Sequence, residues 1–248
     1  MDYTLTITEL LNTKEILRRK DLVFFFRDAF PGISDSNINW KIQNLTRNGL
    51  LERAGVGRYI HSKRKPFKFD NYEIVPKLSK YLEENFPYLL YSIWDTRTLS
   101  RLTVHQPARF MIVLEVERGL EMTLFNFLKE SYKDVFIKPD QREYDLYIAD
   151  REDPVIIKSG VTQSPLMLNS GVKVPRLEKV LVDLFVDDII FTPFQGAELT
   201  TIFKNAFKLY SVNLTTMLRY AGRRGAKKRI MQFLSAAGLQ NHILRIKH

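Results

Sequence analysis

The chain has 248 residues, which is enough for one large domain or two ordinary ones. Hydrophobic residues make up 45% and aromatic residues 12%, so the chain can bury a substantial core and wholesale disorder is excluded. The formal net charge of +10 favours a polyanionic partner, and the lack of cysteine excludes disulfides and cysteine metal sites. Neither a secretory signal pattern nor an apolar run of roughly 20 residues is visible, so we expect a cytoplasmic protein with no membrane partner.

The first thirty residues are predicted to be helical. Residues 4–12 and 13–30 read as two helices, or as one helix that breaks near Asn12. Apolar side chains from Leu17 to Phe30 mark the buried side of the second helix. Pro31 and Gly32 end it and turn the chain toward the next helix.

Residues 34–61 are predicted to form a helix, a strand, a glycine turn and a second strand, which is the order of a recognition helix and its wing. Ser34 or Ser36 can cap the helix by accepting a hydrogen bond from a free backbone N–H group. Ile38, Ile42 and Leu45 are spaced i, i+4, i+7 and predict one buried stripe.

The other side of this helix carries amides and cations, and no acid occurs between Asp35 and Glu52. Such side chains read base edges or hold phosphates. Trp40 can stack on a sugar or base or wedge against the preceding helix, and we expect it to be partly buried. The residues predicted to enter the major groove are Asn37, Trp40, Lys41, Asn44 and Arg47.

Gly49 is expected to end the helix, and residues 50–53 and 58–61 are expected to pair across Gly55 and Gly57. Cations that hold phosphates or reach the minor groove from the wing are predicted at Arg53, Arg58, Lys63, Arg64 and Lys65. The last three can equally belong to a solvated linker. We place the domain boundary here, with a winged helix-turn-helix over residues 1–68 and an α/β effector domain over 69–248.

The second domain alternates strands and helices before a helical end, so we predict an α/β (α+β) chain: a winged helix-turn-helix, then a larger mixed α/β domain with a helical C-terminal part. Helices are predicted over 73–86, 96–102, 119–131, 174–185, 196–210, 213–221 and 225–237. Strands are predicted over 88–94, 110–116, 134–137, 144–148 and 155–158. Pro175 fits the first turn of its predicted helix.

Cations gather around Gly222 and Gly225 near the end of the chain. They can form a second anionic contact, with DNA or with an acidic partner, or they can be a helix end with a solvated face. The residues in question are Arg223, Arg224, Lys227 and Lys228.

The sequence pattern predicts that the chain is not an enzyme and that it has no cofactor site and no metal site. The four histidines are scattered without metal-ligand spacing, and no glycine-rich phosphate loop follows a strand. The alternative is a metal-dependent nuclease of the restriction-enzyme type, which needs acids on adjacent strands and a lysine. Its candidate residues are Asp145, Asp150, Asp153 and Lys158, with Glu115 and Glu117 at the end of another strand. However, Ile156 stands where such a site wants a Glu.

Three segments together resemble the AbiEi-type antitoxins of type IV abortive-infection toxin–antitoxin systems, a form of phage defence. They are the wing pattern 53–59, the helix pattern 175–183 with its Glu178-Lys179 pair, and the tail 213–221. The resemblance implies a transcriptional autorepressor that binds inverted repeats of double-stranded DNA in its own promoter. It also implies a second domain that counters a cognate nucleotidyltransferase-type toxin. The remaining alternative is a protein-interaction module that does not bind DNA.

Overall fold

A computed structural model describes residues 14, 16–47, 49–53, 55–62, 64–70 and 72–240. The chain divides into two compact units. The first contains residues up to Phe67 together with 206–215 and the chain from Leu234 onward, and the second contains 68–205 and 216–233. Over the described residues the fold is mixed α/β with three small sheets. The predicted helix over 4–12 lies outside these residues, and the functional boundary at residue 68 stays a prediction.

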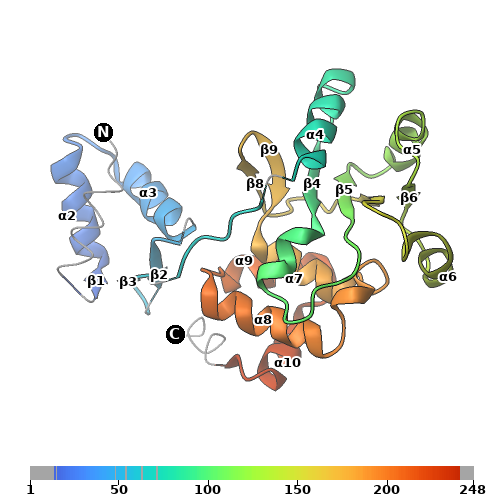
Figure 1. Cartoon of the computed structure of the whole chain (residues 1–248). Helices are drawn as coiled ribbons and strands as arrows, with labels where there is room; N and C mark the ends of the chain where they lie inside the picture. Colours follow the sequence, from blue (N-terminus) through green and yellow to red (C-terminus); the bar gives the residue numbers. More distant parts are fainter. Residues whose placement is uncertain are drawn as a thin grey trace. The chain divides into compact units, whose positions relative to one another are not determined.

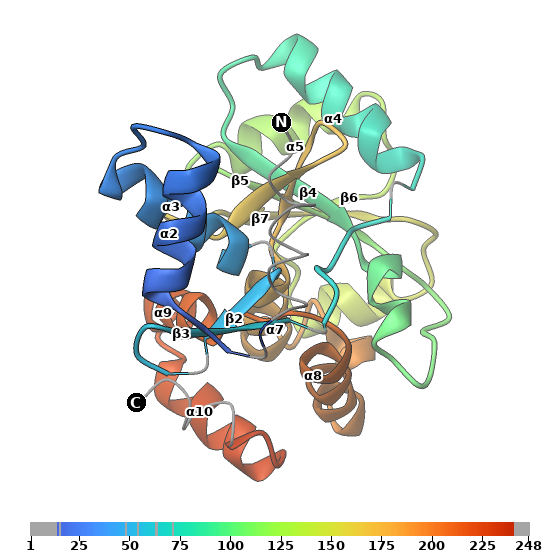
Figure 2. The ribbon, with the colours of Figure 1, turned by 90° about the vertical axis from the view of Figure 1, so that its left-hand side faces the viewer.

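The first unit combines two helices with a three-stranded sheet. Its elements are β1 (Leu17–Arg18), α2 (Arg19–Ala29), α3 (Asp35–Arg47), β2 (Leu51–Arg53) and β3 (Arg58–His61). The strand order is β1-β3-β2, and both pairings are antiparallel (Figures 1 and 2). The helix predicted from residue 13 was therefore wrong at its start. Leu17 pairs with Tyr59 across the sheet, and this tertiary pairing outweighs the local helical pattern.

The core of this unit is apolar and is shared by both helices. Leu22 and Phe26 of α2 pack with Ile38, Ile42 and Leu45 of α3, so the predicted stripe is confirmed. The N–H of Asn37 donates to the Oγ of Ser34 at 3.2 Å, which identifies Ser34 as the helix cap.

The predicted end of α3 and the predicted hairpin are also confirmed. Gly49 has φ +74°, and the N–H of Leu50 donates to the carbonyl of Leu45 at 2.9 Å. This pair of features closes a helix by satisfying its last carbonyl groups. Gly55 and Gly57 also have positive φ, which permits the tight connection between β2 and β3.

The second unit is built on a four-stranded sheet with the order β4-β5-β7-β6 (Figure 1). The strands are β4 (Tyr91–Asp95), β5 (Ile112–Val116), β6 (Val135–Ile137) and β7 (Val155–Ser159). β4 is antiparallel to β5, whereas β5, β7 and β6 run parallel. Every residue of β4 and β5 is buried, as expected for strands covered on both faces. The strands predicted around 88–94, 110–116, 134–137 and 155–158 are thus confirmed.

The helices around this sheet follow the prediction closely. They are α4 (Ile74–Asn85), the 3-10 helix Thr96–Arg101 and α5 (Glu121–Lys129), then α7 (Leu177–Val186), α8 (Ala197–Leu209), α9 (Leu214–Arg223) and α10 (Lys227–Ala236). A second 3-10 helix spans Thr192–Phe194. Among the described helices, none combines the length and the apolar character needed to cross a membrane.

The strand predicted over 144–148 was wrong. This stretch is a π-helix, Tyr144–Ile148, that continues the short helix α6 (Gln141–Glu143). Asp140 caps α6 by accepting from the N–H of Glu143 at 2.7 Å. Tyr144 and Ile148 are buried and lie four residues apart, as on one face of a helix, whereas Leu146 between them is 60% exposed. The alternation of apolar residues that suggested a strand thus includes one residue that the fold leaves at the surface.

The helix predicted to begin at residue 174 was wrong at its start. Val172–Pro175 form strand β9, which pairs with β8 (Leu166–Asn169) across the turn at Ser170 and Gly171. Pro175 therefore ends a strand, and α7 begins at Leu177. Val172 and Val174 are buried by packing in β9, which decides the conformation at this point.

A set of charged side chains is buried between the sheet and the C-terminal helices of the second unit. This buried charge cluster consists of Glu115 on β5, Lys158 on β7, Lys179 and Asp183 on α7, Asp187 just after it, and Arg224 just after α9. Lys158 is 2% exposed and Lys179 is 1% exposed. Such burial is tolerable because three carboxylates face three cations.

Each member of the cluster contacts more than one partner. The Nζ of Lys158 lies 3.1 Å from Glu115 Oε1 and also contacts Asp187. The Nζ of Lys179 lies 2.7 Å from Glu115 Oε2 and also contacts Asp183. The hydroxyl of Tyr220 donates to Asp183 at 2.8 Å. The cluster therefore joins two strands to α7 and α9.

These contacts set the protonation of the cluster. Burial alone would raise the pKa of Asp183, but Lys158, Lys179 and Arg224 lower that pKa to about 2. Burial would lower the pKa of Lys158, whereas Asp183 and Glu115 raise it above its ordinary value. Asp183 and Lys158 are therefore both charged at neutral pH.

We predict that acid destabilises the protein through Asp183. Because the folded-state pKa lies below the ordinary value of 3.8, this carboxylate stabilises the fold at pH values above about 4. The stabilisation is lost as the pH falls toward about 2. Thermal unfolding followed by circular dichroism between pH 6 and pH 2 measures the slope, which Asp183→Asn should flatten. The same change at exposed Asp188 is the control, and an unchanged slope in Asp183→Asn would contradict the assignment.

Candidate nucleic-acid interface

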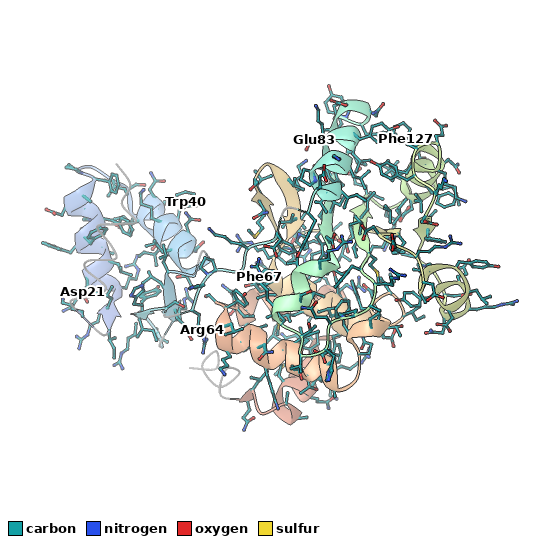
Figure 3. The ribbon with its side chains drawn as sticks, viewed as in Figure 1. Asp21, Trp40, Arg64, Phe67, Glu83 and Phe127 are labelled. Atoms are coloured by element: carbon teal, nitrogen blue, oxygen red, sulfur yellow. The ribbon has the colours of Figure 1, made fainter. Side chains whose placement is uncertain are left out.

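The outward side of α3 is polar apart from one aromatic side chain. Ser36, Asn37, Asn39, Trp40 and Gln43 are exposed, and Trp40 is 58% exposed (Figure 3). Trp40 is thus more exposed than the partial burial that we expected. Lys41, rather than Trp40, lies against the aromatic rings of Phe26 and Phe30 beside the buried stripe. A flat aromatic side chain beside three amides can stack on a base or sugar while the amides hydrogen-bond.

The predicted groove-facing residues separate into different environments. Asn37 and Trp40 lie on the outward side, whereas Lys41 and Asn44 are half-buried. The ammonium of Lys41 lies 4.3 Å from the centre of the Phe30 ring, a cation–π contact that holds it against α2. The side chain of Arg47 lies outside the described part of the chain. The exposed side of α3 is therefore shifted by about one residue from the predicted groove-facing side, and it includes Asn39 and Gln43.

Arg19 connects the wing to α3, and sequence reasoning missed it. Its Nη2 donates to the Oδ1 of Asn39 at 2.8 Å, and its backbone N–H donates to the carbonyl of Gly57 at 2.7 Å. The guanidinium of Arg19 is thereby held beside the exposed amide of α3. One cation and one exposed amide thus form a single preorganised unit.

Two arginines stand opposite each other on neighbouring strands. Arg18 of β1 is in register with Arg58 of β3, and both are exposed. Like charges directly opposite each other destabilise a sheet, so this arrangement suits a surface that meets an anion. Arg53, also exposed, stands opposite Tyr59 instead.

The other predicted wing cations differ in their availability. Lys65 is exposed, and Lys63 lies outside the described residues. Arg64 is half-buried, and its Nη1 lies 3.5 Å from Glu52 Oε1 (Figure 3). That ion pair partly neutralises Arg64. Lys65 and Arg58 are consequently the stronger candidates for phosphate contacts among the predicted set.

The sequence did contain a signal for the missed residues, the cationic run Arg18-Arg19-Lys20. All three residues are exposed, and Arg19 and Lys20 lie in the first turn of α2. Cations are disfavoured at this end of a helix dipole. Asp21 offsets part of this cost, because it accepts from the N–H of Arg18 at 2.7 Å and from Lys14, contacts that lower the pKa of Asp21.

The basic tail is only partly directed outward. Arg224 belongs to the buried charge cluster, and Arg223 donates to the carbonyl of Thr162 at 2.7 Å. Lys227 and Lys228 are exposed at the start of α10. An anionic contact in this region is therefore best assigned to these two lysines.

Of the residues weighed for a nuclease, Glu115 and Lys158 meet in the buried charge cluster, and the others lie in separate surroundings. Asp145 lies on the π-helix and accepts from Gln141, and Asp153 is paired with Arg97. Asp150 is exposed, and Lys158 lies in the buried charge cluster. Within the described ranges, no group of three or more His, Asp or Glu side chains is arranged to hold a metal ion.

A comparison with protein-family models matches residues 37–240 to DUF6577, a family of unknown function. The chain belongs to this family. The DUF6577 match begins on α3 and extends beyond α10, so it includes Trp40, the β2–β3 hairpin and all of the second unit. A search of curated proteins finds no match. The description of DUF6577 names no activity, and the resemblance to AbiEi-type antitoxins stays a prediction.

We predict that Arg58→Thr stabilises the protein in the absence of a ligand. Removing one arginine of the Arg18–Arg58 pair relieves cross-strand repulsion, worth about 0.2–1 kcal/mol at low salt. The gain should shrink as salt screens the charges. Urea unfolding at two ionic strengths measures it. Arg53→Thr on the same hairpin faces Tyr59 and is the matched control, so an equal gain in both variants would argue against repulsion.

Proposed function

We propose that this protein is a DNA-binding transcriptional regulator whose first unit is a winged helix-turn-helix. The strand-helix-helix-strand-strand order, with β1 paired to β3, is the arrangement of that motif. In it α3 is the recognition helix and the β2–β3 hairpin is the wing. The proposal depends most on the outward side of α3, where amides and Trp40 are exposed without an acidic neighbour after Asp35.

The charges around α3 support duplex DNA as the ligand. Arg18 and Arg58 are paired beside the wing turn, and Arg19 bonds to both Gly57 of that turn and Asn39 of α3. Cations that flank a polar helix place it in register on the phosphate backbone, and base edges are then read by the amides. The net charge of +10 agrees with such a ligand.

The affinity of one small winged helix for DNA is modest, so two copies on an inverted repeat are expected. In that arrangement each α3 enters one major groove, with half-sites about one helical turn apart. Lys65 and Arg58 hold phosphates, whereas Asn37, Trp40 and Gln43 approach the base edges.

We predict that two classes of variant differ in how they bind DNA from the chain's own promoter. Gln43→Ala or Asn37→Ala should lose about 1–3 kcal/mol of discrimination between the operator and random DNA. Lys65→Ala or Arg58→Thr should weaken binding to the operator and to random DNA equally. Each change should also reduce the slope of log affinity against log salt concentration by about one unit. Gel shifts at two salt concentrations make the measurement.

Asn126→Ala, which changes an exposed amide of α5, is the control for the base-reading class. The assignment of the reading face is wrong if Gln43→Ala and Asn37→Ala bind the operator like the unaltered protein. Absence of any salt-dependent binding to duplex DNA would instead favour the alternative of a protein-interaction module that does not bind DNA.

We further propose that the second unit serves as the antitoxin part of a type IV abortive-infection system, as the AbiEi resemblance implies. Residues 175–183 supply the end of β9 and most of α7, and residues 213–221 supply most of α9. The buried charge cluster joins these two segments, which makes them one rigid structure that a partner protein can recognise. This role rests on the resemblance and is independent of the DNA-reading face.

We predict that co-expression with a neighbouring nucleotidyltransferase-type toxin restores growth that the toxin alone arrests. A Trp40→Ala variant should still restore growth, because it alters the DNA-reading face and leaves the second unit intact. Growth curves after induction give the readout. If neither the unaltered protein nor the Trp40→Ala variant restores growth, the antitoxin role is wrong. Binding to DNA in gel shifts would still support the regulator in that case.

A further inference from the structure

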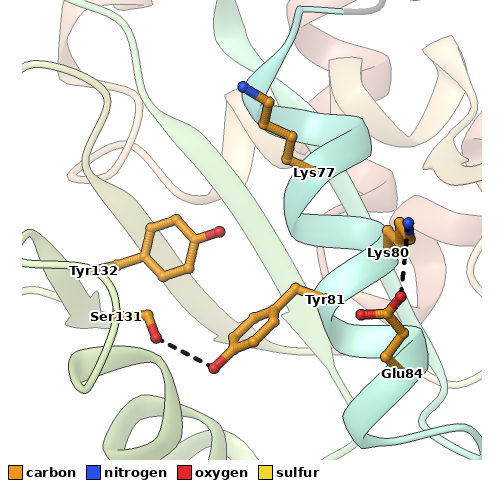
Figure 4. Close-up of a pocket in the computed structure, with 6 residues that line it drawn as sticks. All are labelled: Lys77, Lys80, Tyr81, Glu84, Ser131 and Tyr132. Carbon is orange, nitrogen blue, oxygen red and sulfur yellow. Dashed lines mark hydrogen bonds and ion pairs between the residues drawn. The ribbon is translucent and has the colours of Figure 1, made fainter.

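A pocket in the second unit combines aromatic rings, hydroxyl groups and lysines (Figure 4). It has a volume of about 500 Å³ and is lined by Lys77, Lys80, Tyr81 and Glu84 of α4 and by Ser131 and Tyr132 after α5. Ligand sites usually range from about 300 to 1,000 Å³. The pocket therefore has room for a molecule of nucleotide size.

The aromatic wall of the pocket is held rigidly. Tyr81 stacks on Phe127 with ring centres 5.0 Å apart, and Phe127 in turn contacts Phe86 edge-on. The hydroxyl groups of Tyr81 and Ser131 lie 3.2 Å apart and form a hydrogen bond (Figure 4). Tyr132 is tilted by 55° from Tyr81, so the two rings form an angled surface. A flat ring can lie on one of these rings and meet the edge of the other.

The polar groups of the pocket favour an anion. Lys77 and Lys80 are both exposed, and their present partners are exposed glutamates on the same helix, Glu73 at 2.6 Å and Glu84 at 3.7 Å. Exposed helical ion pairs of this kind contribute little to stability, so the ammonium groups can turn to a stronger anion. Burial raises the pKa of Tyr132, which therefore keeps its hydroxyl proton and can donate it. Lys77 and the hydroxyl-bearing Tyr132 both line this pocket (Figure 4).

We propose that this pocket binds a nucleotide unit. The base stacks on the Tyr81–Tyr132 surface, the phosphate contacts Lys77 and the Tyr132 hydroxyl, and the carboxylate of Glu84 accepts from the ribose hydroxyls. Stacking tolerates any base, and a charge-assisted contact to phosphate is stronger than a neutral one. The ligand is either a free nucleotide or one unit of a single strand, which share this chemistry. The inference goes beyond the proposed regulator and does not depend on it.

The test is isothermal titration of the full chain with adenosine 5′-monophosphate, adenosine and inorganic phosphate. The monophosphate should bind about tenfold more tightly than either fragment, because it alone satisfies both the rings and the lysine. Lys77→Ala should weaken the monophosphate about tenfold and leave adenosine unchanged. Lys204→Ala, an exposed lysine of α8 away from the pocket, should change neither. Tyr81→Phe keeps the ring packing and should retain stacking.

A tetra-adenylate strand separates the two sources of the nucleotide. Binding tighter than that of the monophosphate, and equally dependent on Lys77, assigns the site to a single strand. Equal or weaker binding assigns it to the free nucleotide. The proposal is overturned if the monophosphate shows no saturable binding, if phosphate alone binds as well, or if Lys77→Ala binds the monophosphate like the unaltered chain. Lys77 is exposed, so its replacement does not threaten folding.

Discussion

The buried charge cluster is the interaction on which the second unit depends. Lys158 and Lys179 are almost fully excluded from water, and a buried ammonium is tolerated only with close carboxylates. Glu115 and Asp183 meet this requirement from different elements, so β5, β7 and α7 have one permitted arrangement. Removal of a single partner leaves an uncompensated charge, at a cost of about 3–5 kcal/mol.

The first unit is built in the reverse way from the second: its charged side chains lie at the surface and its core is apolar. Leu22, Phe26 and Ile38 hold α2 against α3, while Arg18 and Arg58 face each other at the surface. Such a surface is less stable alone than one with alternating charges. In the proposed regulator, a polyanion would relieve this repulsion on binding, so the residues that lower stability in isolation would raise the affinity for DNA.

Two of the segments that resemble the antitoxin family, 175–183 and 213–221, have a clear structural role in this chain. Lys179 and Asp183 of the 175–183 pattern are buried members of the charge cluster, and Tyr220 of the 213–221 pattern donates to Asp183. The resemblance therefore reflects the construction of the second unit. In the proposed antitoxin role, a partner protein would contact the exposed surface of the rigid structure that these two segments form.

Local patterns determined much of the outcome. The Ile38-Ile42-Leu45 stripe, the glycine hairpin and most helices and strands were predictable, because periodicity and turn chemistry act over a few residues. The polar side of α3 was predictable too, although its rotation by about one residue depended on how Lys41 packs against Phe30.

Only the tertiary structure decided the remainder, because it depended on contacts between residues far apart in the chain. The conformation of Leu17 follows from pairing with Tyr59, and that of Pro175 from pairing with Leu166. Glu115 and Lys179 are 64 positions apart, so their ion pair could not be found by spacing. The pocket has the same origin, since Lys77 and Tyr132 come together only when α4 packs beside the end of α5. A sequence pattern reports which faces prefer burial, and folding decides which faces meet.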